Sequence, residues 1–167
     1  MEFTVLTQKR LKELLTYDPE TGYFYWNERR GRMAKGAKAG WSKSTKDTYP
    51  RIAIDGKLYR VHRLAWLYVH GVWPEKQLDH KDGVRNNAAL DNLRPATQSE
   101  NNQNQKRAHK RNKSGYLGVC FDKKTSKWRS AITLNYKTTH LGYFDTPAEA
   151  HEKYLEAKSK LHPFGCL

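Results

Sequence analysis

The spacing of apolar residues at the start of the chain predicts a short helix followed by a strand. Residues 7–15 carry leucines at positions 11, 14 and 15, which fall on one face of a helix, and Thr7 is a suitable N-cap. The segment 18–22, DPETG, has the composition of a turn, and the aromatic run 23–26 that follows it predicts a strand. We expect these aromatic side chains to pack in a core, although they could also stack on nucleic-acid bases.

A hairpin and an apolar helix are predicted further on. Apolar and polar positions alternate in residues 49–54 and 57–61, on either side of Asp55-Gly56, a dipeptide that favours a hairpin turn. The run VHRLAWLYV at 61–69 predicts a helix that ends at Gly71. Residues 27–46 are rich in Arg, Lys, Gly and Ser and predict a mobile basic loop, either a solvated linker or an arm that contacts phosphates.

Residues 77–102 predict a strand, a loop, a second strand and a helix. The strands are Gln77–His80 and Leu93–Ala96, and the loop between them contains Gly83 and several asparagines. Thr97 and Glu100 have the spacing of a capping box, which predicts a helix that starts at Thr97. Asn101 then lies in the first turn of this helix.

The pattern after residue 113 predicts a separate small unit. Residues 116–121, 128–134 and 138–144 are expected strands, and Thr146-Pro147-Ala148-Glu149 has the residues of a helix start. The helix should run to about residue 161. Its expected apolar face consists of Ala150, Tyr154, Ala157 and Leu161. The fold class is therefore α+β, with a three-stranded antiparallel sheet and one packing helix in this part.

The charge of the chain indicates a polyanionic partner. The 167 residues carry a net charge of +14, with 31 Lys and Arg against 17 Asp and Glu. Residues 61–102 are neutral, with five charges of each sign, whereas the flanks 1–60 and 103–167 carry 13 against 7 and 13 against 5. A neutral centre between two basic flanks suits a protein that grips a nucleic-acid backbone with its flanks.

The cysteines and the hydropathy exclude other classes. Cys120 and Cys166 do not form a CxxC pair, so neither a zinc finger nor a disulfide framework is expected. No run of 18 apolar residues predicts a membrane span, and the N-terminus has no signal pattern. We therefore expect a cytoplasmic protein without a membrane partner, in a bacterial host if the gene belongs to a phage.

Three residue types in the segment 77–102 suit phosphodiester hydrolysis. Asp79 and Asn101 offer oxygen ligands for a hard divalent ion such as Mg²⁺ or Mn²⁺. His80 has an unperturbed pKa near neutrality and can take a proton from water. A metal ion with an adjacent base is the usual constellation of a metal-dependent hydrolase.

The same segment resembles the HNH endonucleases, in the subgroup found among phage and intron homing enzymes. The resemblance rests on Leu78-Asp79-His80-x-x-Gly83, Asn86-Asn87, Asp91-Asn92-Leu93-Arg94 and Ser99-Glu100-Asn101, in this order and spacing. It implies a ββα-metal site in which Asp79 and Asn101 bind the metal and His80 is the general base. It also implies that Asn92 braces the loop and orients His80. The paired cysteines that hold a structural zinc in some members are missing, so no structural zinc is expected.

Residues 114–167 resemble the AP2 DNA-binding domain. The resemblance rests on Gly118-Val119, Lys127-Trp128-x-x-x-Ile132, Leu141-Gly142-x-Phe144-Asp145-Thr146 and Glu149-Ala150. It implies that the three-stranded sheet lies in the major groove of DNA. Plant members have Arg on both sides of Gly-Val, where this chain has Leu117 and Cys120. Base readout by arginine is therefore not expected at those two positions. Trp128 is expected either to contact DNA or to pack between sheet and helix.

The remaining candidate residues are side chains that could contact double-stranded DNA from the loops, the linker and the sheet. They are Arg29, Arg30, Arg32, Arg63, Lys106, Arg107, Lys110, Arg111, Lys113, Lys123, Lys124, Lys127, Trp128 and Arg129. His62 lies beside Arg63; we interpret His62 as structural, with a functional role as the alternative.

These observations predict an HNH nuclease domain at 1–105 with its motif at 77–102, a basic linker at 106–113 and an AP2-like domain at 114–167. The predicted function is a metal-dependent DNA endonuclease, of the homing type with a long recognition site, acting as a monomer or weak dimer. The alternatives are a catalytically inactive DNA-binding regulator, which would require a damaged site, and an RNA-binding protein, for which no RNA-recognition motif is present.

Overall fold

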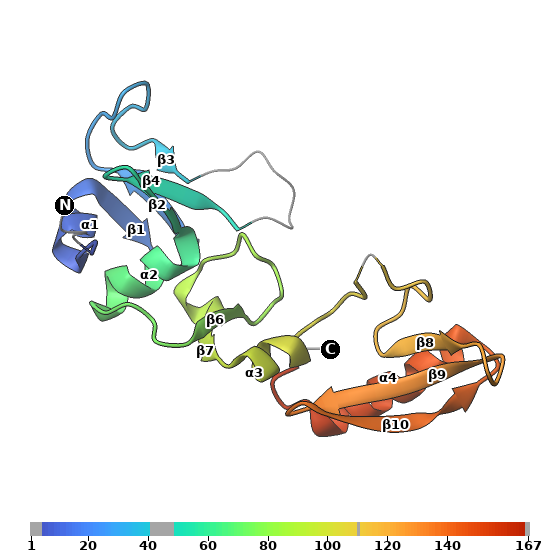
Figure 1. Ribbon diagram of the computed structural model, residues 1–167. Helices are drawn as coiled ribbons and strands as arrows, with labels where there is room; N and C mark the ends of the chain where they lie inside the picture. Colours follow the sequence, from blue (N-terminus) through green and yellow to red (C-terminus); the bar gives the residue numbers. More distant parts are fainter. Residues whose placement is uncertain (1–4, 41–48, 110, 166–167) are drawn as a thin grey trace. The chain divides into compact units, whose positions relative to one another are not determined.

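Residues 5–40, 49–109 and 111–165 are described in the computed structural model of this protein (Figure 1). The chain divides into two units, Met1–Pro95 and Ala96–Leu167, and each is treated by itself. The predicted domain boundaries at 105 and 114 stay a prediction. Cys166 and Lys110, as well as residues 41–46 of the predicted basic loop, lie outside the described residues.

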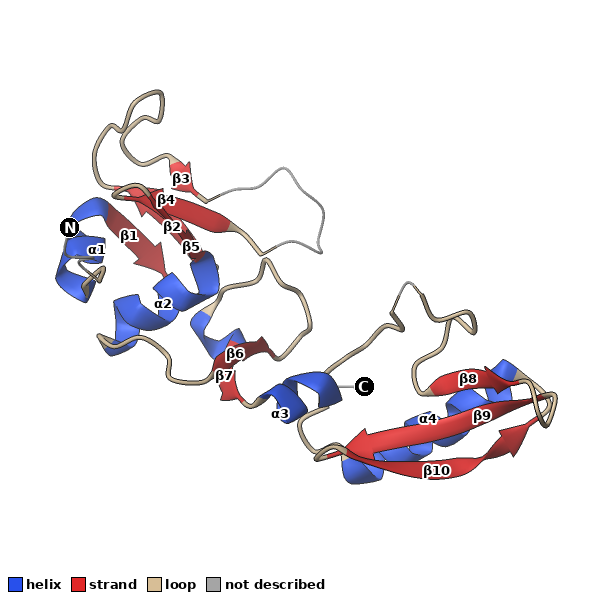
Figure 2. Ribbon diagram, in the orientation of Figure 1, coloured by secondary structure: helices blue, strands red, loops and turns tan. Residues whose placement is uncertain are grey.

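The first unit combines two helices with short antiparallel strands (Figure 2). Its sheets are β1-β2-β3, β4-β5 and β6-β7. Its elements are α1 (Gln8–Leu14), β1 (Leu15–Asp18), β2 (Tyr23–Trp26), β3 (Lys38–Ala39), β4 (Arg51–Ile54), β5 (Lys57–Arg60), α2 (Val61–His70), β6 (Gln77–His80), the 3-10 turn η1 (Leu90–Asn92) and β7 (Leu93–Ala96).

The cap and turn residues of this unit adopt the conformations that the sequence predicts. Thr7 caps α1 by accepting a hydrogen bond from the Arg10 amide at 3.2 Å. Asp55 and Gly56 both have positive φ, 47° and 78°, which is the conformation of a type I′ turn between β4 and β5. Gly71 ends α2 in the left-handed conformation. The strands Gln77–His80 and Leu93–Ala96 are confirmed at the predicted bounds.

The prediction of a loop over residues 27–46 is wrong at Lys38–Ala39, which form the strand β3. The Trp26 amide donates to the Ala37 carbonyl at 3.0 Å, and the Gly36 amide donates to the Trp26 carbonyl at 2.7 Å. Phe24 then pairs with Ala39, which is buried. The segment folds back because β2 would otherwise leave an edge of unpaired backbone groups over the core.

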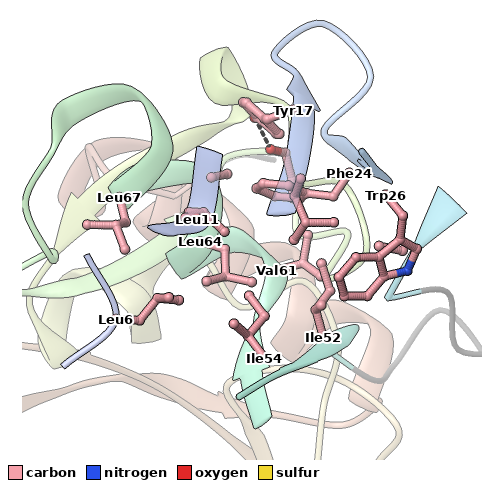
Figure 3. Close-up of a cluster of buried hydrophobic side chains, with 14 of the residues drawn as sticks. Leu6, Leu11, Tyr17, Phe24, Trp26, Ile52, Ile54, Val61, Leu64 and Leu67 are labelled. Atoms are coloured by element: carbon pink, nitrogen blue, oxygen red, sulfur yellow. Dashed lines mark hydrogen bonds between the residues drawn. The ribbon is translucent and has the colours of Figure 1, made fainter. Parts of the chain in front are cut away.

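The core of the first unit joins the N-terminal elements to the segment around residue 90 (Figure 3). Its fully buried centre includes Leu11, Leu15, Phe24, Ile52 and Leu64. Ala88 and Leu93 belong to the same cluster. Burial of Phe24 and Trp26 confirms the expected core packing for these two residues, whereas Tyr23 and Tyr25 are only half-buried.

The turn between β1 and β2 packs directly on the loop between β6 and η1. The buried Tyr17 hydroxyl donates to the Ala88 carbonyl at 2.7 Å, the dashed line in Figure 3. Gly22 has φ +73°, and a Cβ built on it would lie 2.2 Å from the Ala89 nitrogen. Only glycine permits this close approach, so the N-terminal hairpin supports the loop that follows β6.

The second unit consists of α3 (Gln98–Gln103), β8 (Val119–Asp122), β9 (Lys127–Leu134), β10 (Lys137–Phe144) and α4 (Pro147–Leu161). The three strands form an antiparallel sheet in the order β10-β9-β8, and α4 packs on it. Both predicted capping boxes are present, Thr97 with Glu100 and Thr146 with Glu149. Gly118 has φ +72° and lies so close to Tyr154 that a Cβ would come within 2.0 Å of its ring.

The predicted apolar face of α4 is only partly correct. Ala150 and Tyr154 are buried, but Leu161 is exposed and Lys158 is buried in its place, at 3% exposure. The Lys158 ammonium donates to the Gln105 carbonyl at 2.7 Å, so a backbone oxygen replaces water beside its charge while its methylene groups are buried. This bond ties the segment after α3 to α4.

Candidate active site

The Asp-His pair lies at the end of β6, where the strand meets the loop that leads to η1. Asp79 and His80 are 8% and 4% exposed, so both side chains are largely withdrawn from water. The Gly83 amide donates to the His80 carbonyl at 2.8 Å, which turns the chain directly after the pair. Buried polar side chains at a strand end are positioned by the core beneath them.

Asn92 braces this loop through three side-chain bonds. Its amide group donates to the Asp82 carboxylate at 3.0 Å and to the Asn87 carbonyl at 2.9 Å, and its oxygen accepts from the Asp82 amide at 3.0 Å. Asn87 donates to the other Asp82 oxygen at 2.7 Å. The Lys81 amide, next to His80, donates to the Asn92 carbonyl at 2.9 Å. The bracing part of the predicted role therefore has a geometric basis, while its effect on His80 stays a prediction.

Asp79 is held by Arg94 across the β6-β7 pair. The Arg94 guanidinium donates through Nε and Nη2 to the same oxygen, Oδ2, at 3.0 and 2.9 Å. Both side chains are mostly buried, which strengthens their attraction relative to a surface pair. Arg94 was part of the motif in the sequence but was not among the predicted site residues. Arg94 follows the apolar Leu93 on a predicted strand that neighbours the strand of Asp79, and this position was the signal that could have identified it.

His80 packs against two other rings. The His62 ring lies edge-on to it, with 5.0 Å between the centroids, and the Tyr49 ring lies 5.8 Å away. Burial lowers the pKa of His80, against the opposing effects of Asp82 and Asp79, and Arg85 lowers it further. At neutral pH the imidazole is therefore uncharged, which is the form that accepts a proton.

His62 is the second buried histidine, at 4% exposure. Burial, His80 and the nearby Arg60 and Arg63 lower its pKa to about 3. Within the described residues its Nδ1 atom has no hydrogen-bond partner. These features agree with the interpretation of His62 as a structural residue, and its role stays a prediction.

Asn101, the other predicted metal ligand, lies in α3, three residues after its first residue, Gln98. This helix belongs to the second unit, so the pairing of Asn101 with Asp79 stays a prediction. Among the residues that the structure describes, no group of three or more His, Cys, Asp and Glu side chains could hold a metal ion. Carboxylate and amide oxygens instead suit an ion that keeps several waters or phosphate oxygens.

The arginines of the first unit that are predicted to contact DNA lie in two places. Arg30 lies over the Trp26 ring at 4.9 Å, and Arg29 and Arg32 are exposed in the same turn. Arg63 lies over the Trp73 ring at 5.7 Å and donates to the Pro74 carbonyl at 3.5 Å. Arg63 is thus directed toward the chain that follows α2.

The predicted contacts of the second unit lie mainly on exposed surface. Trp128 alternates in phase with the buried Ser130 and Ile132 and therefore lies on the α4 side of the sheet. Arg129 lies on the opposite face, between Cys120 on β8 and Tyr143 on β10. The other exposed candidates are Lys106, Arg107, Arg111, Lys113, Lys123, Lys124 and Lys127.

Comparison with known proteins defines the class. A protein-family model described as HNH endonuclease matches residues 59–103, which run from β5 through α2, β6 and β7 to α3. The match contains Asp79, His80, Asn92 and Asn101. The chain therefore carries an HNH endonuclease domain, and this part of the expectation is confirmed.

The chain is also similar to Protein 3.8 of Escherichia phage T7. The two are 39% identical over 82 residues, which is 48% of this chain and 67% of the phage protein. The chain belongs to the family of this phage protein. No solved structure matches the chain significantly. Across the described residues, no helix has the length and apolarity needed to cross a membrane.

Proposed function

We propose that this protein is a metal-dependent DNA endonuclease in which His80 is the general base. The observation that carries the proposal is the buried Asp79-His80 pair at the end of β6, within the HNH endonuclease match. The lowered pKa of His80 supports it, because a neutral imidazole can take a proton from the water that attacks a phosphodiester. Asn92 keeps the adjoining loop in place through Asp82 and Asn87.

Asp79 and Asn101 are the residues that would hold the metal ion, Mg²⁺ or Mn²⁺. Their donor atoms are hard oxygens, which fit such an ion, and the described residues hold no thiolate cluster that would favour zinc. A bound divalent ion would supply positive charge to the phosphate oxygens. Arg94 holds the Asp79 carboxylate in a fixed direction through its two bonds to Oδ2.

We further propose that the second unit binds double-stranded DNA in the manner of an AP2 domain. In its sheet α4 covers one face, and the other face exposes the row Cys120, Arg129 and Tyr143. The 13 basic against 5 acidic residues of 103–167 support a phosphate-binding role. A DNA-reading unit attached to a nuclease would give the long recognition site of a homing enzyme.

One active unit per chain cuts one strand at a time, so a monomer would nick and a weak dimer would cut both strands. The kinship with a phage protein supports a site of action in the cytoplasm of a bacterial host. The competing function is a DNA-binding regulator without catalysis, and Arg94 on Asp79 is the feature that would favour it.

Plasmid cleavage decides between the two functions. The wild-type protein should nick or linearise supercoiled plasmid with Mg²⁺, and a chelator should abolish the reaction. His80→Ala should reduce the rate by about 100-fold or more, the usual scale for a general base, without loss of DNA binding. His70→Ala, an exposed histidine on α2, is the control. DNA binding without cleavage by the wild type would favour the regulator.

A further inference from the structure

Two arginines from different parts of the first unit meet on one tyrosine ring. The guanidinium carbons of Arg60 and Arg85 lie 5.0 and 5.3 Å from the centroid of Tyr49. Tyr49 precedes β4, Arg60 is the last residue of β5, and Arg85 lies in the loop between β6 and η1. Their convergence therefore depends on the tertiary fold and not on neighbouring positions in the chain.

The Tyr49 ring also lies beside His80. Tyr49 lies 5.1 Å from the His62 ring and 5.8 Å from the His80 ring, centroid to centroid. The cations are close enough to act on these histidines: Arg60 lowers the pKa of His62, and Arg85 lowers that of His80. The positive charge of the pair is thus concentrated beside the proposed general base.

Two guanidinium groups on one ring repel each other unless something compensates. The face of an aromatic ring attracts cations and offsets part of this repulsion. Other arginines of the unit have carboxylate partners, such as Asp55 for Arg10 and Asp79 for Arg94. For Arg60, the described residues provide no ion pair with an acid, and both Arg60 and Arg85 are exposed. An anion can therefore reach both guanidinium groups from the solvent.

We propose that Arg60 and Arg85, held in place by Tyr49, form a clamp for backbone phosphates of the DNA strand that is hydrolysed beside His80. This inference rests on the proposed function. Guanidinium groups form paired, charge-assisted hydrogen bonds to phosphate oxygens. Because both lie within 5.3 Å of one centroid, they reach adjacent phosphates, which are spaced about 3.4 Å apart along the axis of one strand. The clamp provides phosphate contacts at the segment 61–102, which carries no net charge.

The test measures binding separately from cleavage. Binding of a short fluorescent DNA duplex is followed by anisotropy in chelator at several salt concentrations, so that no strand is cut. Arg60→Ala and Arg85→Ala should each weaken binding about tenfold, the scale of a lost charge-assisted bond. Each should also reduce the slope of log affinity against log salt by about 0.9.

Arg51→Ala is the matched control, because Arg51 is the cross-strand neighbour of Arg60 on the same hairpin and carries the same charge. It should change affinity much less. Tyr49→Ala removes no charge, yet it should weaken binding about as much as the loss of both arginines, and Tyr49→Phe should restore binding because it keeps the ring. Thermal unfolding of each variant identifies any loss of folding.

The outcomes distinguish the clamp from the nuclease proposal. If Arg60→Ala and Arg85→Ala bind like Arg51→Ala, or if Tyr49→Ala folds and binds like wild type, the clamp is wrong, whether or not plasmid is cut. If the arginine and tyrosine variants lose affinity as expected while the wild type cuts no DNA, the clamp holds as a phosphate site and the nuclease proposal fails.

Discussion

The two units of the chain differ in which polar side chains they bury. The first unit buries Asp79, His80 and His62 and surrounds them with rings and hydrogen bonds. The second unit also buries polar side chains, namely Gln103, Asn104, Ser130, Lys158 and His162, but it exposes most of its described basic side chains, with Arg129 on the open face of the sheet. Burial fixes direction and shifts pKa values, which chemistry needs, whereas exposure leaves charge available to many phosphates. This difference supports the proposal that the first unit cuts DNA and that the second unit binds it.

The largest effect is expected at the centre of the first unit. Asp79→Ala should reduce plasmid cleavage to background and abolish Mn²⁺ binding in a calorimetric titration, because a methyl group cannot replace an anionic oxygen ligand. DNA binding should persist, because the gripping residues are unchanged. An Asp79→Ala protein that binds Mn²⁺ as tightly as wild type would remove this carboxylate from the metal site.

Arg94 provides the companion experiment. Arg94→Ala should destabilise the protein by about 3 kcal/mol, because the largely buried Asp79 carboxylate loses its cation. Adding Asp79→Ala should recover part of that loss, since the uncompensated charge is gone. Denaturant unfolding of the two single variants and the double variant gives the coupling energy. A double variant less stable than Arg94→Ala would show that the ion pair is not what stabilises this position.

A pair of glycines allows each unit to be weakened separately. Gly22→Ala and Gly118→Ala should each cost roughly 2–4 kcal/mol, because φ is positive and a Cβ meets the Ala89 nitrogen or the Tyr154 ring. Gly22→Ala displaces the loop after β6 and should reduce cleavage. Gly118→Ala should reduce DNA affinity instead. Calorimetry should show one of two unfolding transitions lowered in each variant.

The control for both substitutions is Gly56→Ala, which has φ +78° but open space around the added carbon. It should cost only about 1 kcal/mol, from backbone strain alone. If Gly22→Ala and Gly118→Ala lower the same transition, the two units do not unfold independently, and the comparison between them fails.

Local structure was predictable from sequence because its causes lie within a few residues. The Asp55-Gly56 turn, the end of α2 at Gly71 and the capping box at Thr97 each depend on a backbone conformation or a side chain that the local sequence specifies. The strands on either side of the Asn-rich loop followed from the same kind of signal. The order of the HNH residues along the chain then indicated the chemistry.

Contacts between distant residues were not predictable in this way. The bond from Arg94 to Asp79 and the approach of Arg85 to Tyr49 depend on how separate elements pack. Lys158 can be buried because a carbonyl 53 positions earlier in the chain accepts a hydrogen bond from its ammonium group, which no periodicity on α4 shows. The fold-back of residues 27–40 likewise depends on the unpaired edge of β2.

A smaller effect is expected on the open face of the second unit. Arg129→Ala should weaken DNA binding several-fold and reduce the salt slope by about 0.9, as expected for one lost phosphate contact. Lys160→Ala, on α4 and paired with Glu156, removes the same charge from the helix and should have less effect. Anisotropy with a duplex at several salt concentrations makes the comparison. Equal effects of the two substitutions would mean that the sheet face has no special role.

The smallest effect concerns the pH dependence of the second unit. His162 is buried, with Nε2 3.0 Å from the Thr133 carbonyl oxygen, and burial is the main cause that lowers its pKa. The unfolded state, with a histidine pKa of about 6.5, therefore binds more protons than the folded state as pH falls below that value. The contribution of the neutral histidine to stability is present above pH 6.5 and is lost as the pH falls below it.

The Tm of the second-unit transition should thus decrease between pH 8 and pH 5, a window above the usual pKa values of carboxylates. His162→Gln, which can still donate a hydrogen bond, should flatten this decrease. The first unit should lose more stability over the same window, because it buries two histidines, His62 and His80, whose pKa values are both lowered. If the second unit is the more acid-sensitive one, or if His162→Gln leaves its pH profile unchanged, neutral buried histidines do not set the difference between the units.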